Sequence, residues 1–417
     1  MKKEHKMKNV ILFLLSQIIS LFGSAIVQYA IIWHITITTG SGVMTTIATL
    51  CGFLPQVLIS VFSGVWADRY NKKKIIMIAD TSIALSTLVV AICFMFGLNS
   101  IWLLFIALGI RSLGSGVQAP TVNAFIPELV EENKLMKVNG INTTIQSITL
   151  IVAPAISGAI MPIMSMGKIL FIDVITAIIG VGIMLLVKVK IEKVKEQKNK
   201  DEKINYLADM KEGIKYIKEH KFIKRFFKYY AILIILIAPI ALLNPLMVTR
   251  SYGTEEWRLT VNEIAFFVGS IVGGGIISVW GGFKNKIKTI ALACFLYGIF
   301  GILIGITNNF NIYLILMGLL GLSMPMFNTP SVVILQEAVE SNMQGRIFAI
   351  LNIISSGIMP LSMIFYGPLA DYVRVESIVI VTSIIFAIFP IIFIKDKKLK
   401  KYEVVNKIIE DENKEEI

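Results

Sequence analysis

The sequence predicts an all-α integral membrane protein, with twelve transmembrane helices in two pseudo-symmetric six-helix bundles. Composition, a series of apolar runs and an internal repeat carry this prediction. Of the 417 residues, 55% are hydrophobic and 16% are charged, whereas soluble domains carry about 25% charged residues. A hydrocarbon layer of about 30 Å is crossed by roughly 20 helical residues. The chain is therefore too apolar for water and long enough for twelve crossings.

Each expected span is an apolar run bounded by charged or turn-forming residues. Runs of this length in a charge-poor stretch are typical of transmembrane helices. We expect spans at residues 9–36, 43–66, 75–97, 101–125, 139–163, 168–188, 226–249, 261–281, 287–307, 311–335, 346–368 and 376–394.

The basic residues are divided unequally between the two sides of the membrane that these spans define. With the N-terminus inside, 35 of the 40 Lys and Arg fall in cytoplasmic segments, as the inside-positive rule requires. This predicts a multi-pass protein of the cell membrane whose N- and C-termini are both cytoplasmic. The net charge of +12 is then explained by the inner loops and anionic lipid headgroups, and no nucleic-acid partner is expected.

Short stretches of the first half recur in the second. Pro120-Thr121-Val122 returns 210 residues later as Pro330-Ser331-Val332, and Asn71-Lys72 returns 214 residues later as Asn285-Lys286. The two echoes fall at equivalent places, in the fourth and tenth spans and after the second and eighth. Duplicated six-helix halves can rock about a central site and expose it to each side in turn.

This repeat sets the expected domain boundaries. We expect an N-terminal bundle at residues 1–187, a cytoplasmic linker at 188–225, a C-terminal bundle at 226–394 and a charged cytoplasmic tail at 395–417. In the linker, apolar residues recur at three- and four-residue steps, which favours an amphipathic helix on the inner surface. A solvated tether remains the alternative.

At the end of the second span, the sequence resembles the signature of the major facilitator superfamily. The stretch is Gly64-Val65-Trp66-Ala67-Asp68-Arg69-Tyr70-Asn71-Lys72-Lys73-Lys74, with lysines where the family pattern has arginines. The resemblance covers about 385 residues. It implies a transporter that works by alternating access.

Two further stretches resemble motifs of proton-linked members. Arg111 precedes Gly114 and Gly116 in the fourth span. The antiporter motif is matched in the fifth span at Gly140, Ala153, Pro154 and Gly158. Together with Gly345-Arg346 and Gly367-Pro368-Leu369-Ala370-Asp371 in the second half, these are similar to the macrolide-efflux-like branch of drug:proton antiporters.

The signature can also be argued physically as a gate. Asp68 ends the second span, where a carboxylate can accept hydrogen bonds from the N-terminus of a neighbouring helix and complement its dipole. We expect that partner near Gly345 and Arg346, and we assign gating roles to Gly64, Asp68, Arg69 and Arg346. The equivalent place in the second half holds Gly281-Gly282-Phe283, so this latch is expected on one side only.

Arg111 lies about 16 Å from the outer end of its helix at 1.5 Å per residue. A charge at this depth costs at least about 2.5 kcal/mol and needs a polar partner. The first candidate partner is Asp80, followed by Asp173 and Glu263. We assign proton coupling to these four residues.

Uncharged polar residues on the apolar spans are candidates for the lining of a substrate cavity. Hydrogen bonds between helices are the alternative for each of them. The candidates are Gln17, Gln28, Gln118, Asn123, Asn142, Gln146, Asn244, Asn328 and Asn352.

The predicted function is secondary active efflux of hydrophobic, drug-like compounds, macrolides among them, in exchange for protons. No G-x-x-x-x-G-K-[ST] loop is present in the sequence, which excludes ATP binding by that route. The three histidines are scattered, so no enzyme activity, cofactor or metal site is expected. The alternatives are a lysophospholipid exporter, a siderophore exporter or a metabolite facilitator. The expected partners are a small hydrophobic substrate, protons and the lipid bilayer, with the chain acting as a monomer.

Overall fold

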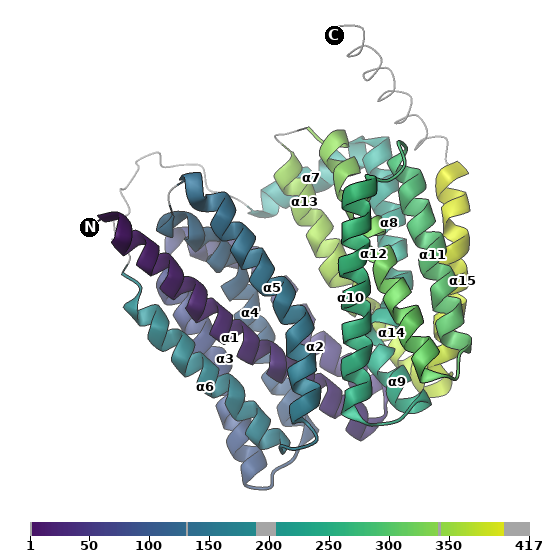
Figure 1. Ribbon diagram of the computed structural model, residues 1–417. Helices are drawn as coiled ribbons and strands as arrows, with labels where there is room; N and C mark the ends of the chain where they lie inside the picture. Colours follow the sequence, from purple (N-terminus) through teal and green to yellow (C-terminus); the bar gives the residue numbers. More distant parts are fainter. Residues whose placement is uncertain (1, 131, 189–205, 341–342, 396–417) are drawn as a thin grey trace, which may run out of the picture. The chain divides into compact units, whose positions relative to one another are not determined.

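The computed structural model describes residues 2–130, 132–188, 206–340 and 343–395, and within these ranges some side chains, including that of Asp68, are not described. The described part is built from helices and contains no strand. Twelve stretches are long and apolar enough to cross a membrane. The predicted all-α class and the twelve spans are therefore confirmed (Figure 1).

The helices follow the expected order of spans. The first six are α1 (Lys2–Thr39), α2 (Gly42–Arg69), α3 (Lys72–Met95), α4 (Ile101–Leu129), α5 (Glu132–Ile160) and α6 (Met166–Leu186). The linker helix is α7 (Tyr206–Glu219). The last six spans are formed by α8 (Lys221–Leu242) with α9 (Asn244–Ser251), α10 (Glu256–Trp280), α11 (Lys286–Ile306), α12 (Phe310–Ala338), α13 (Gln344–Ile353) with η1 (Ile354–Ile358) and α14 (Met359–Tyr372), and α15 (Val375–Lys395).

Two of these spans are interrupted. The seventh breaks at Leu243, four residues after Pro239, because proline removes a backbone donor and bends a helix. In the eleventh span, η1 is a five-residue π-helical segment, and Pro360 follows it at the start of α14. The seventh span also begins at Lys221, five residues before the position expected from the sequence.

The chain divides into two compact units. Unit 1 comprises Met1–Gly40, Met44–Ile204 and Thr254–Thr260, and unit 2 comprises Ser41–Val43, Asn205–Gly253 and Val261–Ile417. In unit 1, α3 packs against α4 and α6, and α1 packs against α5 and α6. In unit 2, α11 packs against α12 and α15.

The internal repeat of the sequence also appears in the hydrogen bonds of the structure. Asn71 caps α3 by accepting from the backbone N–H of Lys74 at 3.1 Å. Asn285 caps α11 in the same way, accepting from Ile287 N–H at 2.9 Å. A side-chain acceptor at this position satisfies backbone donors that the first turn leaves open. The two asparagines that the repeat aligned therefore have the same role, since each caps the N-terminus of a helix.

The lysine after each cap also has an equivalent partner. Lys72 Nζ lies 2.5 Å from Glu128 Oε1 near the end of α4. Lys286 Nζ lies 2.8 Å from Glu337 Oε1 near the end of α12. Each half thus ties the start of its third span to the end of its fourth. Such partly exposed pairs contribute at most about 1 kcal/mol each to the stability of the fold. Their main effect is to align these helix ends.

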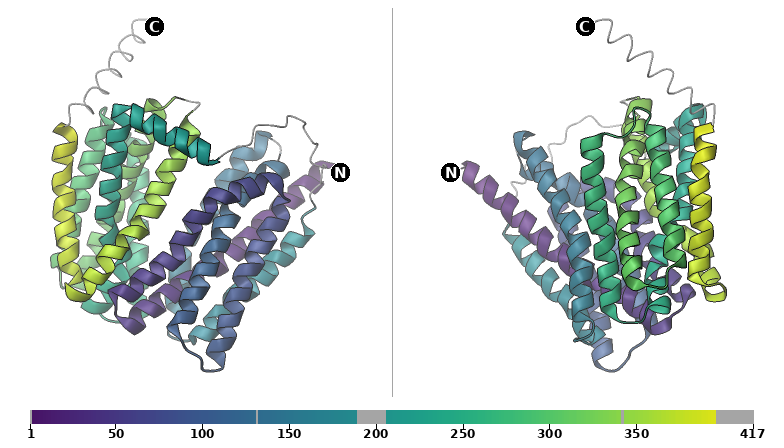
Figure 2. Two further views of the ribbon diagram at one scale, coloured as in Figure 1. Left: turned by 180° about the vertical axis from the view of Figure 1, so that it is seen from behind. Right: turned by 45° about the vertical axis from the view of Figure 1, so that its right-hand side comes forward.

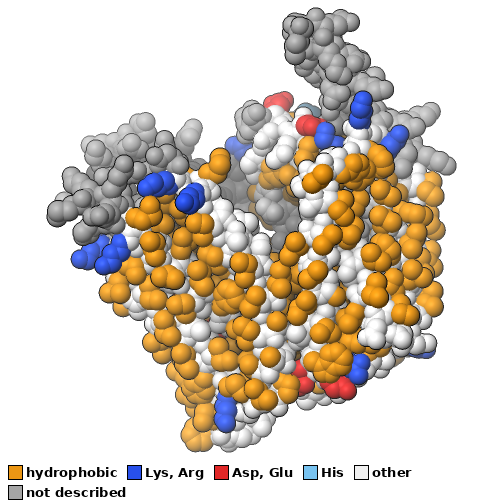
Figure 3. Space-filling model, viewed as in Figure 1, with side chains coloured by type: hydrophobic (Ala, Val, Ile, Leu, Met, Phe, Trp, Pro, Cys, Tyr) orange, Lys and Arg blue, Asp and Glu red, His pale blue; other side chains and the backbone are white. Residues whose placement is uncertain are grey.

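The predicted amphipathic linker helix is present as α7. It contacts α8 and α13 and lies across their ends rather than parallel to them (Figure 2). Residues 189–205 of the expected linker and 396–417 of the expected tail lie outside the described residues. Along the membrane helices, hydrophobic side chains cover the flanks, and Lys and Arg gather at helix ends (Figure 3).

Glycines allow α10 and α12 of unit 2 to touch through their backbones. A Cβ on Gly269 would lie 1.8 Å from the carbonyl oxygen of Gly318, and one on Gly273 would lie 2.1 Å from that of Leu322. A Cβ on the neighbouring Gly274 would meet nothing within 4 Å. Small residues four apart are a recurrent device for close packing in membranes.

We therefore expect Gly273→Val to destabilise the protein by roughly 1–3 kcal/mol, the usual cost of overpacking. The added side chain collides with backbone that cannot swing aside. Thermal unfolding of purified protein in detergent measures the effect. Gly274→Val is the matched control and should unfold close to the unchanged protein. Equal shifts in both variants would contradict this account of the packing.

Candidate functional site

The centre of unit 1 holds an ion pair buried among four helices. Arg111 on α4 is 3% exposed and Asp173 on α6 is 1% exposed, and Arg111 Nη1 donates to Asp173 Oδ2. Removing either partner would leave an unpaired charge, which costs about 3–5 kcal/mol. The pair therefore fixes α4 to α6 at mid-helix.

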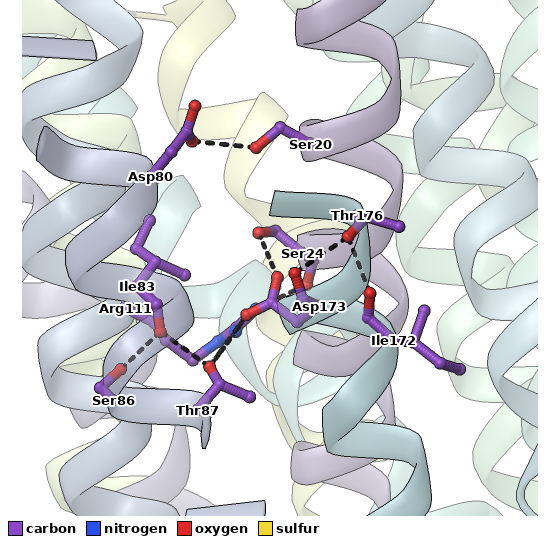
Figure 4. Close-up of polar contacts among 10 residues, drawn as sticks. All are labelled: Ser20, Ser24, Asp80, Ile83, Ser86, Thr87, Arg111, Ile172, Asp173 and Thr176. Carbon is purple, nitrogen blue, oxygen red and sulfur yellow. Dashed lines mark hydrogen bonds and ion pairs between the residues drawn. The ribbon is translucent and has the colours of Figure 1, made fainter. Parts of the chain in front are cut away.

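Two hydroxyl side chains complete this cluster (Figure 4). Thr87 on α3 donates to Asp173 Oδ2 at 2.9 Å and accepts from Arg111 Nη1 at 2.8 Å. Ser24 on α1 donates to Asp173 Oδ1 at 2.7 Å, and its carbonyl oxygen accepts from Arg111 Nη2 at 2.8 Å. Both carboxylate oxygens are thus occupied, as buried charges require.

Asp80 occupies a second, separate position on α3. Its side chain is 5% exposed. Its Oδ1 accepts from Ser20 Oγ on α1 at 2.9 Å and from Gln118 Nε2 on α4 at 2.6 Å. Within the described residues it forms no ion pair. Of these two buried acids, Asp173 is held by an arginine, whereas Asp80 is held, within the described residues, only by neutral donors.

The prediction that Asp80 is the first partner of Arg111 is wrong, because Arg111 forms its ion pair with Asp173. The reason is register. Because α3 and α4 run antiparallel, Arg111 lies level with Thr87, whereas Asp80 lies seven residues before Thr87 on α3, about 10.5 Å away along the helix at 1.5 Å per residue. At that level its neighbour on α4 is Gln118, seven residues after Arg111.

Glu263, the third candidate partner, belongs to unit 2. It follows Asn262 on α10 and is half-buried. Its assignment to proton coupling stays a prediction.

Unit 2 carries a neutral cluster that sequence reasoning found only in part. Asn244 Nδ2 donates to the Tyr313 hydroxyl at 2.8 Å, Tyr313 donates to Asn262 Oδ1 at 2.8 Å, and Asn262 Nδ2 donates to Asn244 Oδ1 at 2.7 Å. All three side chains are at most 4% exposed. The ring of bonds joins α9, α10 and α12. Asn244, a candidate for the cavity lining, forms interhelical hydrogen bonds, and its place in a cavity stays a prediction.

A tyrosine outside the spans borders this cluster. The ring of Tyr252 lies 4.9 Å from that of Tyr313, and its hydroxyl donates to the Thr307 carbonyl at 2.7 Å. Burial and the nearby Glu376 carboxylate raise the pKa of Tyr252 to about 12. The hydroxyl therefore stays protonated and keeps this bond.

The predicted gating residues are only partly visible. Gly64 and Asp68 lie in α2, but the surroundings of Gly64 and the side chain of Asp68 are not described. Arg69 is the exposed last residue of α2. Arg346 lies in the first turn of α13, where Nη2 is 3.3 Å from Glu212 Oε2 on α7. The expected approach of Asp68 to Arg346 stays a prediction.

The polar residues expected to line a cavity fall into two groups. Gln17 and Asn142 are buried, Gln28 is half-buried against Gly52, and Gln118 is committed to Asp80. The others on the spans are exposed side chains, namely Asn123 on α4, Gln146 on α5, Asn328 on α12 and Asn352 on α13. The polar lining of a substrate cavity would have to consist of exposed side chains such as these on the apolar helices.

The antiporter motif makes one tight contact. A Cβ on Gly158 would lie 1.6 Å from Thr260 Oγ1, and the Pro154 carbonyl oxygen accepts from that hydroxyl at 3.4 Å. Ala153 is fully buried. A Cβ on Gly140 would meet nothing within 4 Å. The motif's second half is therefore a packing surface for the start of α10, and Gly140 is not part of it.

The buried pair gives a stability test. Arg111→Met should destabilise the protein by roughly 3–5 kcal/mol, because Asp173 loses its counter-charge. Arg111→Met combined with Asp173→Asn should recover part of that loss. Unfolding midpoints in detergent measure both. Lys72→Met, which breaks a partly exposed pair, serves as control and should change stability by about 1 kcal/mol or less. A double variant no better than the single would refute the assignment.

Comparisons with known proteins agree with this architecture. Residues 13–363 match the family model of the Major Facilitator Superfamily. Macrolide efflux protein A of Streptococcus pyogenes is 30% identical over 362 residues, 86% of this chain and 89% of that protein. The Staphyloferrin A transporter of Staphylococcus aureus is 23% identical, covering 93% of this chain and 96% of that protein.

Solved structures agree on the fold. A POT family transporter in complex with a thioalcohol-conjugated peptide superimposes with a TM-score of 0.71 at 13% identity, over 92% of this chain and 95% of that one. At that identity the likeness concerns the fold alone. The family model covers far more than half of the sequence, and the twelve spans agree with it. The chain therefore belongs to the major facilitator superfamily and is a multi-pass membrane transporter.

Proposed function

We propose that this transporter exports hydrophobic, macrolide-type compounds in exchange for protons by alternating access. The observation that carries the proposal is the pair of acids in unit 1: Asp173 is locked to Arg111, while Asp80 is buried without a cation. The similarity to Macrolide efflux protein A over 86% of the chain supports the substrate class.

Asp80 is the acid that we assign to carry the proton. Asp173 forms the ion pair with Arg111 and so serves the packing of α4 and α6. Within the described residues Asp80 has only neutral donors, and both bind Oδ1, which leaves Oδ2 as the position for a proton. A carboxylate buried without a counter-charge is expensive. Whether Asp80 carries a proton therefore depends on the side of the membrane from which water can reach it.

The bonds of Asp80 link its charge to helix movement. Ser20 lies on α1 and Gln118 on α4, so the carboxylate joins three helices of unit 1. Hydrogen bonds to a charged acceptor are stronger than those to a neutral one. Gain or loss of the proton therefore changes how tightly α1, α3 and α4 are held together, and a shift in their packing favours one orientation of the transporter over the other.

The energetics allow one proton per solute molecule. A single charge crossing 100 mV yields about 2.3 kcal/mol. At 1.36 kcal/mol per tenfold change, that sustains roughly a 50-fold gradient of a neutral solute. A metal, a cofactor or ATP is not needed for export of this size.

The substrate path is assigned to the exposed amides of the spans. Asn123, Gln146, Asn328 and Asn352 are exposed on apolar helices, and polar side chains within membranes generally face water or protein rather than lipid. An apolar surface with a few neutral hydrogen-bonding groups suits a large, mostly hydrophobic solute. The basic-residue map of the sequence places both termini in the cytoplasm, and the direction of transport follows the resemblance to macrolide efflux proteins.

A siderophore exporter is the second candidate, because the Staphyloferrin A transporter covers 93% of this chain. A panel test separates the two. In inverted membrane vesicles energised with a proton gradient, we expect a labelled macrolide to accumulate and staphyloferrin A to stay at background. Accumulation of staphyloferrin A without uptake of the macrolide would favour the second candidate.

Asp80→Asn tests the proton carrier. Asparagine keeps an oxygen for Ser20 and Gln118 but cannot titrate, so gradient-driven accumulation of a labelled macrolide in inverted vesicles should fall at least tenfold. Exchange of labelled for unlabelled macrolide without a gradient should continue. Glu128→Gln, an exposed acid at a helix end, is the control and should pump normally. Undiminished, protonophore-sensitive pumping by Asp80→Asn would reject the assignment.

A further inference from the structure

Gln17, in the middle of α1, is a buried donor for which the described side chains provide no acceptor. Its side chain is 7% exposed, and its Nε2 donates no hydrogen bond within the described part of the chain. A buried N–H without a partner is rare, because the group loses its hydrogen bonds to water on folding and gains none in return. Among the described residues, the other buried donor of this kind is Arg111 Nε, which belongs to the ion pair described above. Gln17 therefore needs a ligand that accepts a hydrogen bond.

The face of α1 that carries Gln17 is fixed by contacts on both sides of it. Four residues earlier, the Phe13 ring packs edge-to-face against Phe125 of α4, with the ring centroids 5.3 Å apart. Three residues later, the Ser20 hydroxyl donates to Asp80 of α3 at 2.9 Å. Residues at steps of three and four share one face of a helix. Gln17 therefore lies on the face of α1 that packs against α3 and α4, one turn along α1 from the partner of Asp80.

Asp80 supplies an acceptor in the same region. Its side chain is 5% exposed. Both hydrogen bonds that it accepts from described residues, one from Ser20 and one from Gln118, end on Oδ1. The region between Gln17 and Asp80 thus holds an N–H donor and a carboxylate oxygen, Oδ2, neither of which has a partner in the described part of unit 1.

Water is the ligand that fits both groups. A cation cannot accept the hydrogen bond of the Gln17 amide, and an anion is repelled by the Asp80 carboxylate. A water molecule accepts from the amide and donates to the carboxylate, and buried waters in proteins typically satisfy polar groups in this way. The chemistry of the two groups therefore points to an internal water between them.

Asp80 lies between Arg111 on one side and Gln17 on the other along the bundle, because α1 and α3 run parallel and α4 runs antiparallel to both (Figure 4). A positive charge hinders the approach of a proton, so the side of Gln17 is the favoured route. On that side Phe13 and Phe125 are at most 1% exposed. Apolar constrictions hinder the passage of water. The aromatic pair therefore controls when a water at Gln17 meets solvent.

We propose that Gln17 is a positioning residue for proton transfer, whose amide holds a water that passes protons to and from Oδ2 of Asp80. The proposal rests on the assignment of Asp80 as the proton carrier. A proton that reaches this water converts it to hydronium. One O–H bond of the hydronium then breaks as the O–H bond of the carboxyl group forms, and a neutral water remains at Gln17. Release of the proton reverses these steps.

Gln17→Met tests this relay, because methionine has nearly the length of glutamine but no N–H. In purified full-length protein reconstituted into lipid, the infrared C=O band of protonated Asp80 is identified by its loss in Asp80→Asn. After transfer to D2O, the shift of this band measures how fast the carboxyl group exchanges hydrogen for deuterium. Exchange should become roughly tenfold slower or more in Gln17→Met, because a reacting group loses at least this much with its positioning. Structural damage would admit water and speed exchange, so slower exchange is specific to the relay.

Ser16→Ala is the matched control. It removes a buried hydroxyl of the same helical turn, whose contacts are with the Phe13 carbonyl oxygen and the Met184 sulfur, and it should leave the exchange rate unchanged. A crystal structure that resolves ordered water gives a second measurement. It should show a water within hydrogen-bond distance of both Gln17 Nε2 and Asp80 Oδ2, and its absence there overturns the proposal.

The outcomes separate the relay from the proposed function. The exchange measurement uses neither macrolide nor a proton gradient, so slower exchange in Gln17→Met without macrolide accumulation counts against the substrate alone. Equal exchange in Gln17→Met and the unchanged protein refutes the relay and leaves Asp80 as the carrier. The lack of any carboxyl band that depends on Asp80 refutes the carrier, and the relay with it.

Discussion

The buried Arg111–Asp173 pair is the constraint on which unit 1 depends. An arginine in the middle of an apolar helix is tolerated only with a counter-charge and enough acceptors. In this protein the acid comes from α6, and Ser24 and Thr87 add hydrogen bonds from α1 and α3. One costly side chain therefore fixes the relative heights of four helices, and the position of Asp80 follows from the same register.

The two halves use different chemistry for similar structural work. Unit 1 ties its helices with charges, whereas unit 2 ties α9, α10 and α12 with a closed ring of neutral hydrogen bonds around Tyr313. A ring of neutral groups has no net charge to gain or lose near neutral pH. Coupling to protons in our proposal is therefore concentrated in unit 1, and unit 2 acts as the more constant partner.

The sequence predicted the helical class and the number of spans, because apolar length and charge placement are properties of the chain itself. The repeat also aligned Asn71 with Asn285, and the structure shows that both residues cap a helix. The partner of Arg111 could not be chosen with the same certainty, since it depends on the offset between antiparallel helices. The structure supplies that offset, because Arg111 with Thr87 and Gln118 with Asp80 share one register along α3 and α4. Asn262 and Tyr313 gave no signal, because isolated polar residues on a span are common.

The π-helical segment η1 has a consequence for the two ends of the eleventh span. A π turn is wider than an α turn and carries one extra residue, so side chains on either side of it are rotated by about 100° relative to an unbroken α-helix. Arg346 lies before η1 and Asp371 lies after it. The residues before and after η1 therefore lie on faces of the eleventh span that are rotated relative to those of an unbroken helix.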